Sequence, residues 1–196
     1  MKIGSHNSLS YLCPSKWWMH FIAFTARCQS ENLSWQFWLD NVRCFDIHIR
    51  YDEKGNMLFV HGPVVYRYTV TEFTEWLEWF NQRVEKDVEI RLVLDVRTKW
   101  AMQHYDFQRA NFATTCENWE KSYPNIKFWC GHMVKGWRVA YDFDYKPTCT
   151  ELYGSVTEPK WLWGWWPWLY AVTHNKKNIK RGTDDDILLI DYVNIK

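Results

Sequence analysis

The ten-residue stretch VRCFDIHIRY, residues 42–51, constrains the fold of this chain more than any other segment. With the two-residue period of a β-strand, its apolar side chains share one face, namely Phe45, Ile47, Ile49 and Tyr51. The other face carries an acid, an imidazole and a guanidinium, from Asp46, His48 and Arg50. In a parallel α/β barrel such a face points inward and active sites lie at the strands' C-terminal ends. An edge strand with a solvated polar face is the alternative.

The composition is that of one globular domain. The chain has 196 residues, of which 47% are hydrophobic and 24% charged, and this length is enough for a sizeable core. The net charge of +1 gives no indication of a polybasic nucleic-acid-binding surface. The six cysteines show no CxxC pair and no zinc-ligand spacing, which predicts reduced, mostly buried thiols in a reducing compartment.

The N-terminal sequence carries no recognisable signal peptide, because Met1-Lys2 runs directly into IGSHN. No uncharged run of about 18 apolar residues is present, so no membrane span is expected. Together these features predict a cytoplasmic protein, and they leave open a peripheral contact with a membrane surface.

Strand-like and helix-like segments alternate along the chain, which predicts parallel βαβ units and an α/β fold. The expected strands are residues 2–7, 42–51, 57–61, 88–97, 126–130, 137–143 and 187–193. The expected helices are a segment capped by Ser30 or Asn32 and ending at Leu39, then residues 71–84 and 106–123. Residues 8–27 read as irregular, and 147–181 have no clear assignment. We predict a single domain over 1–196, a compact TIM (β/α) barrel that is complete, incomplete or distorted.

Isolated polar residues mark the ends of several predicted strands. They are His6-Asn7, the Asp46/His48/Arg50 face, His61, Asp95 and Asp191. Two histidines that face one cavity suit acid–base chemistry, because one can accept a proton while the other donates one. A cation between them, either a guanidinium or a metal, could stabilise a pentacoordinate phosphate.

The order and spacing of these segments resemble the catalytic domain of phosphatidylinositol-specific phospholipase C, within the barrel-shaped phosphodiesterases. The matching segments are GSHNSLSYL (4–12), VRCFDIHIRY (42–51), LFVHG (58–62), YTVTEFTEWL (68–77), IRLVLDV (90–96) and LLIDYV (188–193). They cover the first half of the chain and the last strand, whereas residues 98–186 carry little of the resemblance.

The resemblance implies a catalytic role for three of these residues. His6 would be the general base that deprotonates the inositol 2-hydroxyl, and His61 the general acid for the leaving alcohol. Asp191 would orient His6, as a buried carboxylate does in a catalytic triad. Arg50, on the same strand face as His48, could reach the phosphate.

The resemblance also implies metal ligands, because Asn7, Asp46 and Asp95 fall where calcium-dependent members hold the ion. All three are oxygen donors, which suit a hard cation such as calcium or magnesium. His48 departs from the family, whose calcium-dependent members have an acid there and whose calcium-independent members have an arginine. The calcium-independent members also tend to carry a lysine at the position of Asp95. A bound Ca²⁺ or Mg²⁺, a transition metal and no metal at all therefore stay open.

Three further residues are candidates for substrate contact: His48, Arg97 and Trp165. Arg97 could instead form an ion pair with Asp95. Trp165 belongs to the tryptophan-rich stretch WLWGWWPWLY, residues 161–170, which suits either the membrane–water interface or the core of a small barrel. The Trp17-Trp18 pair allows the same two interpretations.

We predict a phosphodiesterase in which a neighbouring hydroxyl attacks phosphorus and the alcohol leaves through a cyclic phosphate. Its expected partner is a phospholipid or another phosphodiester, with no nucleic acid. One alternative is a metal-dependent glycerophosphodiester or sphingomyelin-type phosphodiesterase on the same barrel. Another is a catalytically silent barrel that binds a lipid head group or a protein, and His48 is its best support.

Overall fold

The computed structural model describes residues 1–83, 87–134, 139–140, 166–180 and 187–195. The chain has an α/β fold and divides into two compact units, one of residues 1–46 with 147–196 and the other of residues 47–146. Strand β2 (Val42–Tyr51), with the predicted bounds, runs from the first unit into the second. Each unit is described by itself below.

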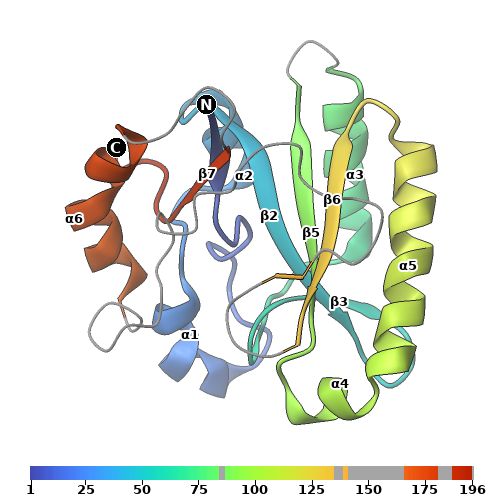
Figure 1. The fold of residues 1–196 in the computed structure, drawn as a ribbon. Coiled ribbons are helices and arrows are strands. Elements are labelled where there is room, and N and C mark those ends of the chain that lie inside the picture. The colour runs from blue at the N-terminus through green and yellow to red at the C-terminus, as the bar shows by residue number, and fades with distance from the viewer. Residues whose placement is uncertain (84–86, 135–138, 141–165, 181–186, 196) are drawn as a thin grey trace. The chain divides into compact units, whose positions relative to one another are not determined.

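The first unit contains a three-stranded parallel arrangement with β1 in the middle. Its elements are β1 (Lys2–Ser5), the 3-10 helix η1 (Trp17–Met19), α1 (His20–Ala26), α2 (Leu33–Trp38), the start of β2, α6 (Pro167–Ile179) and β7 (Ile187–Ile190). Strand β1 pairs in parallel with β7 on one edge and with β2 on the other. Helix α6 lies beside β7 (Figure 1).

Gly4 lets the middle strand fit between its neighbours. A Cβ atom at this position would lie 2.5 Å from Cδ2 of Leu189 on β7 and 3.2 Å from Cβ of Cys44 on β2. Carbon atoms in contact are normally about 3.5–4.0 Å apart. The strand that leads to His6 therefore needs glycine for close packing.

Two segments of the first unit test the sequence prediction. Asn32 caps α2 as expected, because its side chain accepts a hydrogen bond from the backbone N–H of Trp35. The prediction that residues 8–27 are irregular was wrong over 17–26, where η1 and α1 form. Their aromatic side chains are mostly exposed, and only Met19 and Ala26 are buried, so the segment has no apolar stripe that would have predicted a helix.

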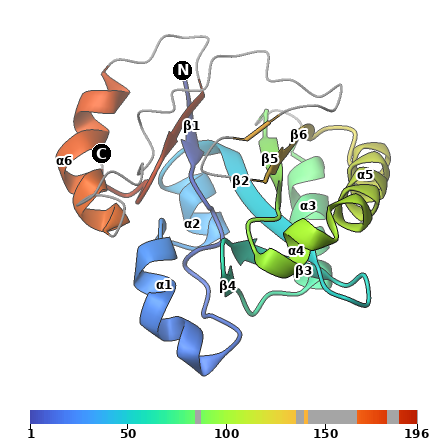
Figure 2. The same cartoon turned by 60° about the horizontal axis from the view of Figure 1, so that its bottom comes forward.

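The second unit combines a hairpin, a parallel strand pair and covering helices. Its elements are the end of β2, β3 (Met57–His61), β4 (Val64–Val65), α3 (Val70–Asn81), β5 (Glu89–Asp95), α4 (Lys99–Gln103), α5 (Tyr105–Ser122) and β6 (Lys127–Met133). Strand β5 pairs with β2 and, in parallel, with β6. Helix α5 packs along β5 and β6 (Figures 1 and 2).

Helix α3 forms where the apolar period predicted it. Phe73, Leu77 and Phe80 are buried, and Phe73 meets Trp119 of α5 with ring centroids 5.4 Å apart. Thr69 and Glu72 close its N-terminus with a reciprocal capping box. Phe73 also contacts Phe59 of β3, with ring centroids 5.1 Å apart, so the helix packs against the strand that ends at His61.

The sheet is mixed, whereas the alternation of elements predicted parallel strands. Strands β2 and β3 are antiparallel because the turn of residues 52–56 is too short for a crossover. Among the described strands, β6 pairs only with β5 and β7 only with β1, so these strands do not close into a barrel.

Both faces of β2 are covered, so the alternative of a solvated polar face was wrong. Asp46, His48 and Arg50 are all buried, at 0%, 2% and 8% exposure. Burying three ionisable side chains is costly unless each finds a partner. Their partners define the candidate site. None of the described helices has the length and apolar character needed to cross a membrane.

Candidate active site

His6 and Asp191 form a buried imidazole–carboxylate pair in the first unit. Nδ1 of His6 lies 2.7 Å from Oδ1 of Asp191, and Asp191 is fully buried. His6 directly follows β1, and Asp191 directly follows β7, which is the parallel neighbour of β1. The parallel register therefore brings together two residues that are 185 positions apart in the sequence.

Two buried amide side chains hold the backbone on either side of this pair. The Nε2 group of Gln29 donates to the carbonyl oxygens of His6 and Ile190, at 3.1 and 2.9 Å, and its Oε1 accepts from the N–H of Val193 at 3.1 Å. The Nδ2 group of Asn175 donates to the carbonyl oxygen of Asp191 at 2.7 Å. The imidazole and carboxylate therefore sit on a fixed frame, as a preorganised site requires.

Asn7 and Asp46 form a second contact in the same unit. Asn7 adopts a left-handed conformation with φ of 44°, and its backbone N–H donates to Oδ2 of Asp46 at 2.9 Å. The hydroxyl of Ser8 accepts from the N–H of Asp46, and the Asn7 amide donates to the carbonyl oxygen of Ala26. Asp46 therefore anchors the turn that follows β1.

Asp95 is the centre of the polar cluster in the second unit. Arg97 binds it with two side-chain bonds, from Nε to Oδ1 at 2.9 Å and from Nη2 to Oδ2 at 2.5 Å. Oδ2 also accepts from the N–H of Gly62 at 2.8 Å and lies 3.4 Å from Nδ1 of His48. Burial alone would raise the pKa of Asp95, but Arg97 and His48 together hold it well below the usual value.

Arg50 adds a second guanidinium to this cluster. Its Nη1 donates to the carbonyl oxygen of Gly62 at 2.7 Å. Burial is the main reason why the pKa of Arg50 is lowered, with Arg97 adding to the effect and Asp95 opposing it. An arginine still keeps its charge at neutral pH, so the unit holds two buried or half-buried cations around one carboxylate.

His61 and His48 contact each other in the second unit. Their rings meet edge to face, with centroids 5.3 Å apart, and both side chains are buried. His61 ends β3, and His48 lies on β2, the strand that pairs with β3. The hairpin thus brings His61, the predicted general acid, next to His48, a predicted substrate contact.

The predicted metal ligands differ in how well they suit a cation. Both carboxylate oxygens of Asp95 already accept hydrogen bonds from the guanidinium of Arg97, so a metal ion there would face a positive charge. Asp95 in this arrangement does not fit a calcium or magnesium site. Asn7 and Asp46 keep oxygen donors of the right type within the first unit, but two such donors alone are few for a hard cation.

Several residues that build the site gave no signal in the sequence. Gln29 and Asn175 act through backbone carbonyls, which no spacing rule reveals. Gly62 has φ of 55°, and the Gly-Pro pair after β3 marks a turn but not its hydrogen bonds to Arg50 and Asp95. The predicted substrate contact Trp165 lies outside the described residues.

Comparisons with known proteins give a distant structural similarity. No protein-family model matches the chain, and no curated protein matches it. The chain is similar to a solved structure of phosphatidylinositol-specific phospholipase C from S. aureus, described in connection with the modulation of its membrane binding. The TM-score is 0.48 at 14% sequence identity, over 97% of this chain and 72% of that chain. Similarity at this level does not establish a family.

Proposed function

We propose that the chain is a phosphodiesterase that uses His6 as general base and His61 as general acid. The observation that carries this proposal is the 2.7 Å bond between Nδ1 of His6 and Oδ1 of the fully buried Asp191. A carboxylate that orients an imidazole and stabilises its protonated form is the arrangement found in hydrolytic triads. The ordered segments that resemble phosphatidylinositol-specific phospholipase C support the same assignment.

The first step is attack by a hydroxyl group of the substrate on its own phosphodiester. With the Nδ1 proton shared with Asp191, Nε2 is the nitrogen of His6 that accepts the hydroxyl proton. As this proton leaves, the oxygen–phosphorus bond forms, and the charge of Asp191 stabilises the resulting imidazolium. Holding the hydroxyl next to phosphorus supplies much of the rate acceleration.

The second half of the step is departure of the alcohol. Protonated His61 donates its proton to the leaving oxygen as the phosphorus–oxygen bond breaks, which yields a cyclic phosphate and a neutral alcohol. Water can then open the cyclic phosphate with the two histidines exchanging roles. Arg50 is the cation that we assign to the phosphate, because the guanidinium of Arg97 is already engaged by Asp95.

The finer parts of the proposal concern fold and substrate. For the fold, we propose a single domain over residues 1–196 of the TIM-barrel phosphodiesterase type, with an incomplete barrel. The substrate is a phosphoinositide-type lipid head group, and the chain contacts the membrane from its periphery.

Exposed aromatic side chains in the first unit support such a contact, namely Trp17, Trp18, Phe21, Phe24, Trp166 and Trp168. The poor fit of Asp95 as a ligand favours chemistry without an obligatory calcium ion.

The experiment is an assay of inositol, choline and glycerol phosphodiesters, each with and without a chelator. We expect turnover of the inositol substrate, release of a cyclic phosphate visible by phosphorus NMR, and little effect of the chelator. Exposed His20 and His104 provide control variants with the same loss of an imidazole. Activity on the other substrates alone, abolished by the chelator, would replace this proposal with the metal-dependent alternative.

A further inference from the structure

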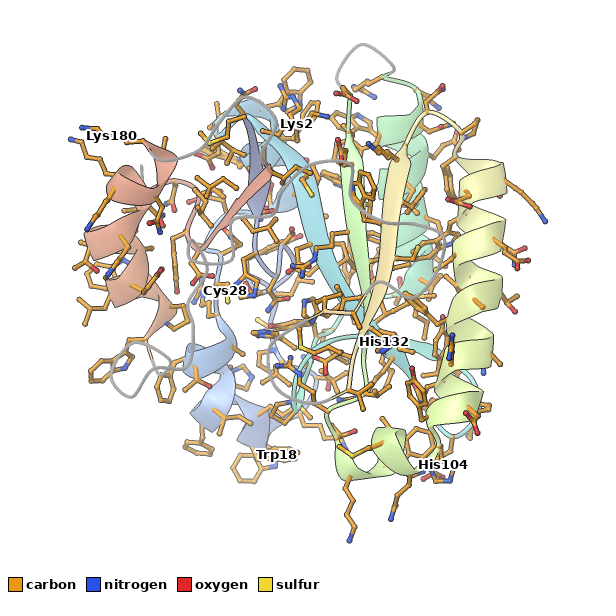
Figure 3. All side chains as sticks on the ribbon, viewed as in Figure 1. Lys2, Trp18, Cys28, His104, His132 and Lys180 are labelled. Carbon is orange, nitrogen blue, oxygen red and sulfur yellow. The ribbon has the colours of Figure 1, made fainter. Side chains whose placement is uncertain are left out.

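His6, Cys28 and Asp191 gather three different metal-binding groups in the first unit. One ring nitrogen, the thiol sulfur and one carboxylate oxygen all lie within 4.8 Å of one another, and all three residues are buried. Cys28, labelled in Figure 3, lies between α1 and α2. The proposed reaction uses His6 and Asp191 but gives no role to the thiol of Cys28, which donates to the carbonyl oxygen of Ala26 at 3.5 Å.

The backbone of Cys28 is held in place next to the other two residues. Its N–H donates to the hydroxyl of Ser10 at 2.9 Å, and its carbonyl oxygen accepts from the N–H of Tyr192 at 2.5 Å. The side chain of the next residue, Gln29, donates to the carbonyl oxygen of His6. The three groups are therefore presented by a rigid frame, which lowers the entropy lost when a ligand joins them.

The chemistry of these groups matches zinc better than calcium. Thiolate, imidazole and carboxylate are the ligand types that zinc prefers, whereas calcium takes oxygen donors. Zinc bonds of about 2.0–2.3 Å place tetrahedral ligands roughly 3.3–3.8 Å apart, which small side-chain rotations can reach from the present spacing. On binding, the ion would displace the thiol proton of Cys28 to solvent and then neutralise a thiolate and a carboxylate that are both buried.

We infer that His6, Cys28 and Asp191 bind a zinc ion, with a fourth ligand from water. The bound ion takes both the imidazole and its carboxylate partner, so it blocks proton transfer by His6. This consequence for activity rests on the proposed function, whereas the metal site itself does not. The site then acts as an inhibitory switch that responds to the supply of a thiol-binding cation.

Metal binding is measured first, without any substrate. Titration calorimetry with zinc should give one site per chain, and cobalt should give the charge-transfer absorption of a thiolate ligand. Cys28→Ser and Asp191→Asn should each weaken zinc binding by at least about 100-fold, since loss of outer-shell partners alone costs 10–100-fold. Cys13→Ser is the matched control, because Cys13 is exposed and lies in the same unit.

Unchanged zinc binding in Cys28→Ser, or its loss in Cys13→Ser, would overturn the inference. Circular dichroism of each variant separates a lost ligand from a lost fold. Zinc should lower the turnover of the wild type, measured as each protein's rate with zinc divided by its own rate without zinc, and this ratio should return toward one in Cys28→Ser. Binding without any turnover would sink the proposed function and leave the zinc site standing, while turnover without binding would do the reverse.

Discussion

The two units hold their buried carboxylates in different ways. In the first unit, Asp191 bonds the imidazole of His6 at 2.7 Å, while its backbone carbonyl is held by Asn175. In the second unit, Asp95 receives two bonds from Arg97 and one from the N–H of Gly62, with His48 at the longer distance of 3.4 Å. The main partner of Asp191 is therefore an imidazole, and the main partner of Asp95 is the guanidinium of Arg97.

The two carboxylates therefore suit different roles: one supports a group that transfers protons, and the other holds charged side chains in position. A carboxylate that bonds an imidazole fixes its tautomer and orientation, which suits a group that gains and loses a proton. A carboxylate locked by a guanidinium has a lowered pKa and keeps its charge, so it suits a group that fixes other side chains. The following changes test this contrast, from the largest expected effect to the smallest.

His6→Ala should have the largest effect because it removes the proposed general base. We expect kcat/KM for a phosphodiester to fall by about 10²–10⁴-fold, and thermal unfolding measures the stability lost when the buried Asp191 loses its imidazole partner. His20→Ala, an exposed histidine of the same unit, should retain the wild-type rate. Equal rates in His6→Ala and in wild type would show that the pair with Asp191 is only structural.

Arg97→Met should have its main effect on stability. It leaves the carboxylate of Asp95, which is fully buried, without its guanidinium partner, and breaking a buried pair in this way costs about 3–5 kcal/mol. Adding Asp95→Asn should restore part of the loss, because the uncompensated charge is then gone. Urea unfolding of both single variants and the double variant measures the coupling between the two residues. Additive effects would contradict the ion pair.

Acid unfolding should report Asp95 through its lowered pKa. The folded value lies below the ordinary unfolded value of about 3.9, so the stabilisation is complete above roughly pH 5. It is lost as the pH falls from there through the folded pKa, because the unfolded chain then binds the proton more readily. Asp95→Asn should flatten this acid limb in a plot of unfolding free energy against pH. An unchanged limb would mean that other carboxylates cause it.

Gly4→Ala should destabilise the first unit by about 1–3 kcal/mol, through overpacking rather than charge. The added methyl group would meet Leu189 at 2.5 Å and Cys44 at 3.2 Å. Leu189→Ala in the same chain should recover part of this loss by providing room. Thermal unfolding of the single and double variants checks both expectations, and a stable Gly4→Ala protein would show that β1 can shift.

The sequence predicted the strands and helices that carry the site better than the hydrogen bonds between their side chains and backbone. The helical period of residues 71–84 reflects burial, whereas the apolar–polar alternation of residues 42–51 belongs to a strand with both faces covered, and both elements form. The sequence did not predict η1 and α1, because their aromatic side chains are exposed and give no apolar stripe along a helix. The bonds of Gln29 and Asn175 join segments far apart in the chain, and only the folded backbone defines their partners.

Removing a helix cap should have the smallest effect on stability. Each unit has such a cap, so the two can be compared. Thr69 begins α3 in the second unit, where its hydroxyl accepts from the N–H of Glu72 and its own N–H donates to the Glu72 carboxylate. Asn32 begins α2 in the first unit with a single side-chain bond. Thr69→Ala should cost about 1 kcal/mol, the usual value for a lost N-cap.

Asn32→Ala should cost less, at about 0.5 kcal/mol, because tertiary bonds already hold its helix. The amide of Gln36 in α2 donates to the carbonyl oxygens of Ser8 and Glu31, so the first turn keeps its position without the cap. Urea unfolding compares the two variants. Nuclear magnetic resonance titration adds a second measurement, since the bonds from Thr69 lower the pKa of Glu72 and Thr69→Ala should raise it. Equal costs for the two caps would mean that the bonds of Gln36 contribute little to the position of α2.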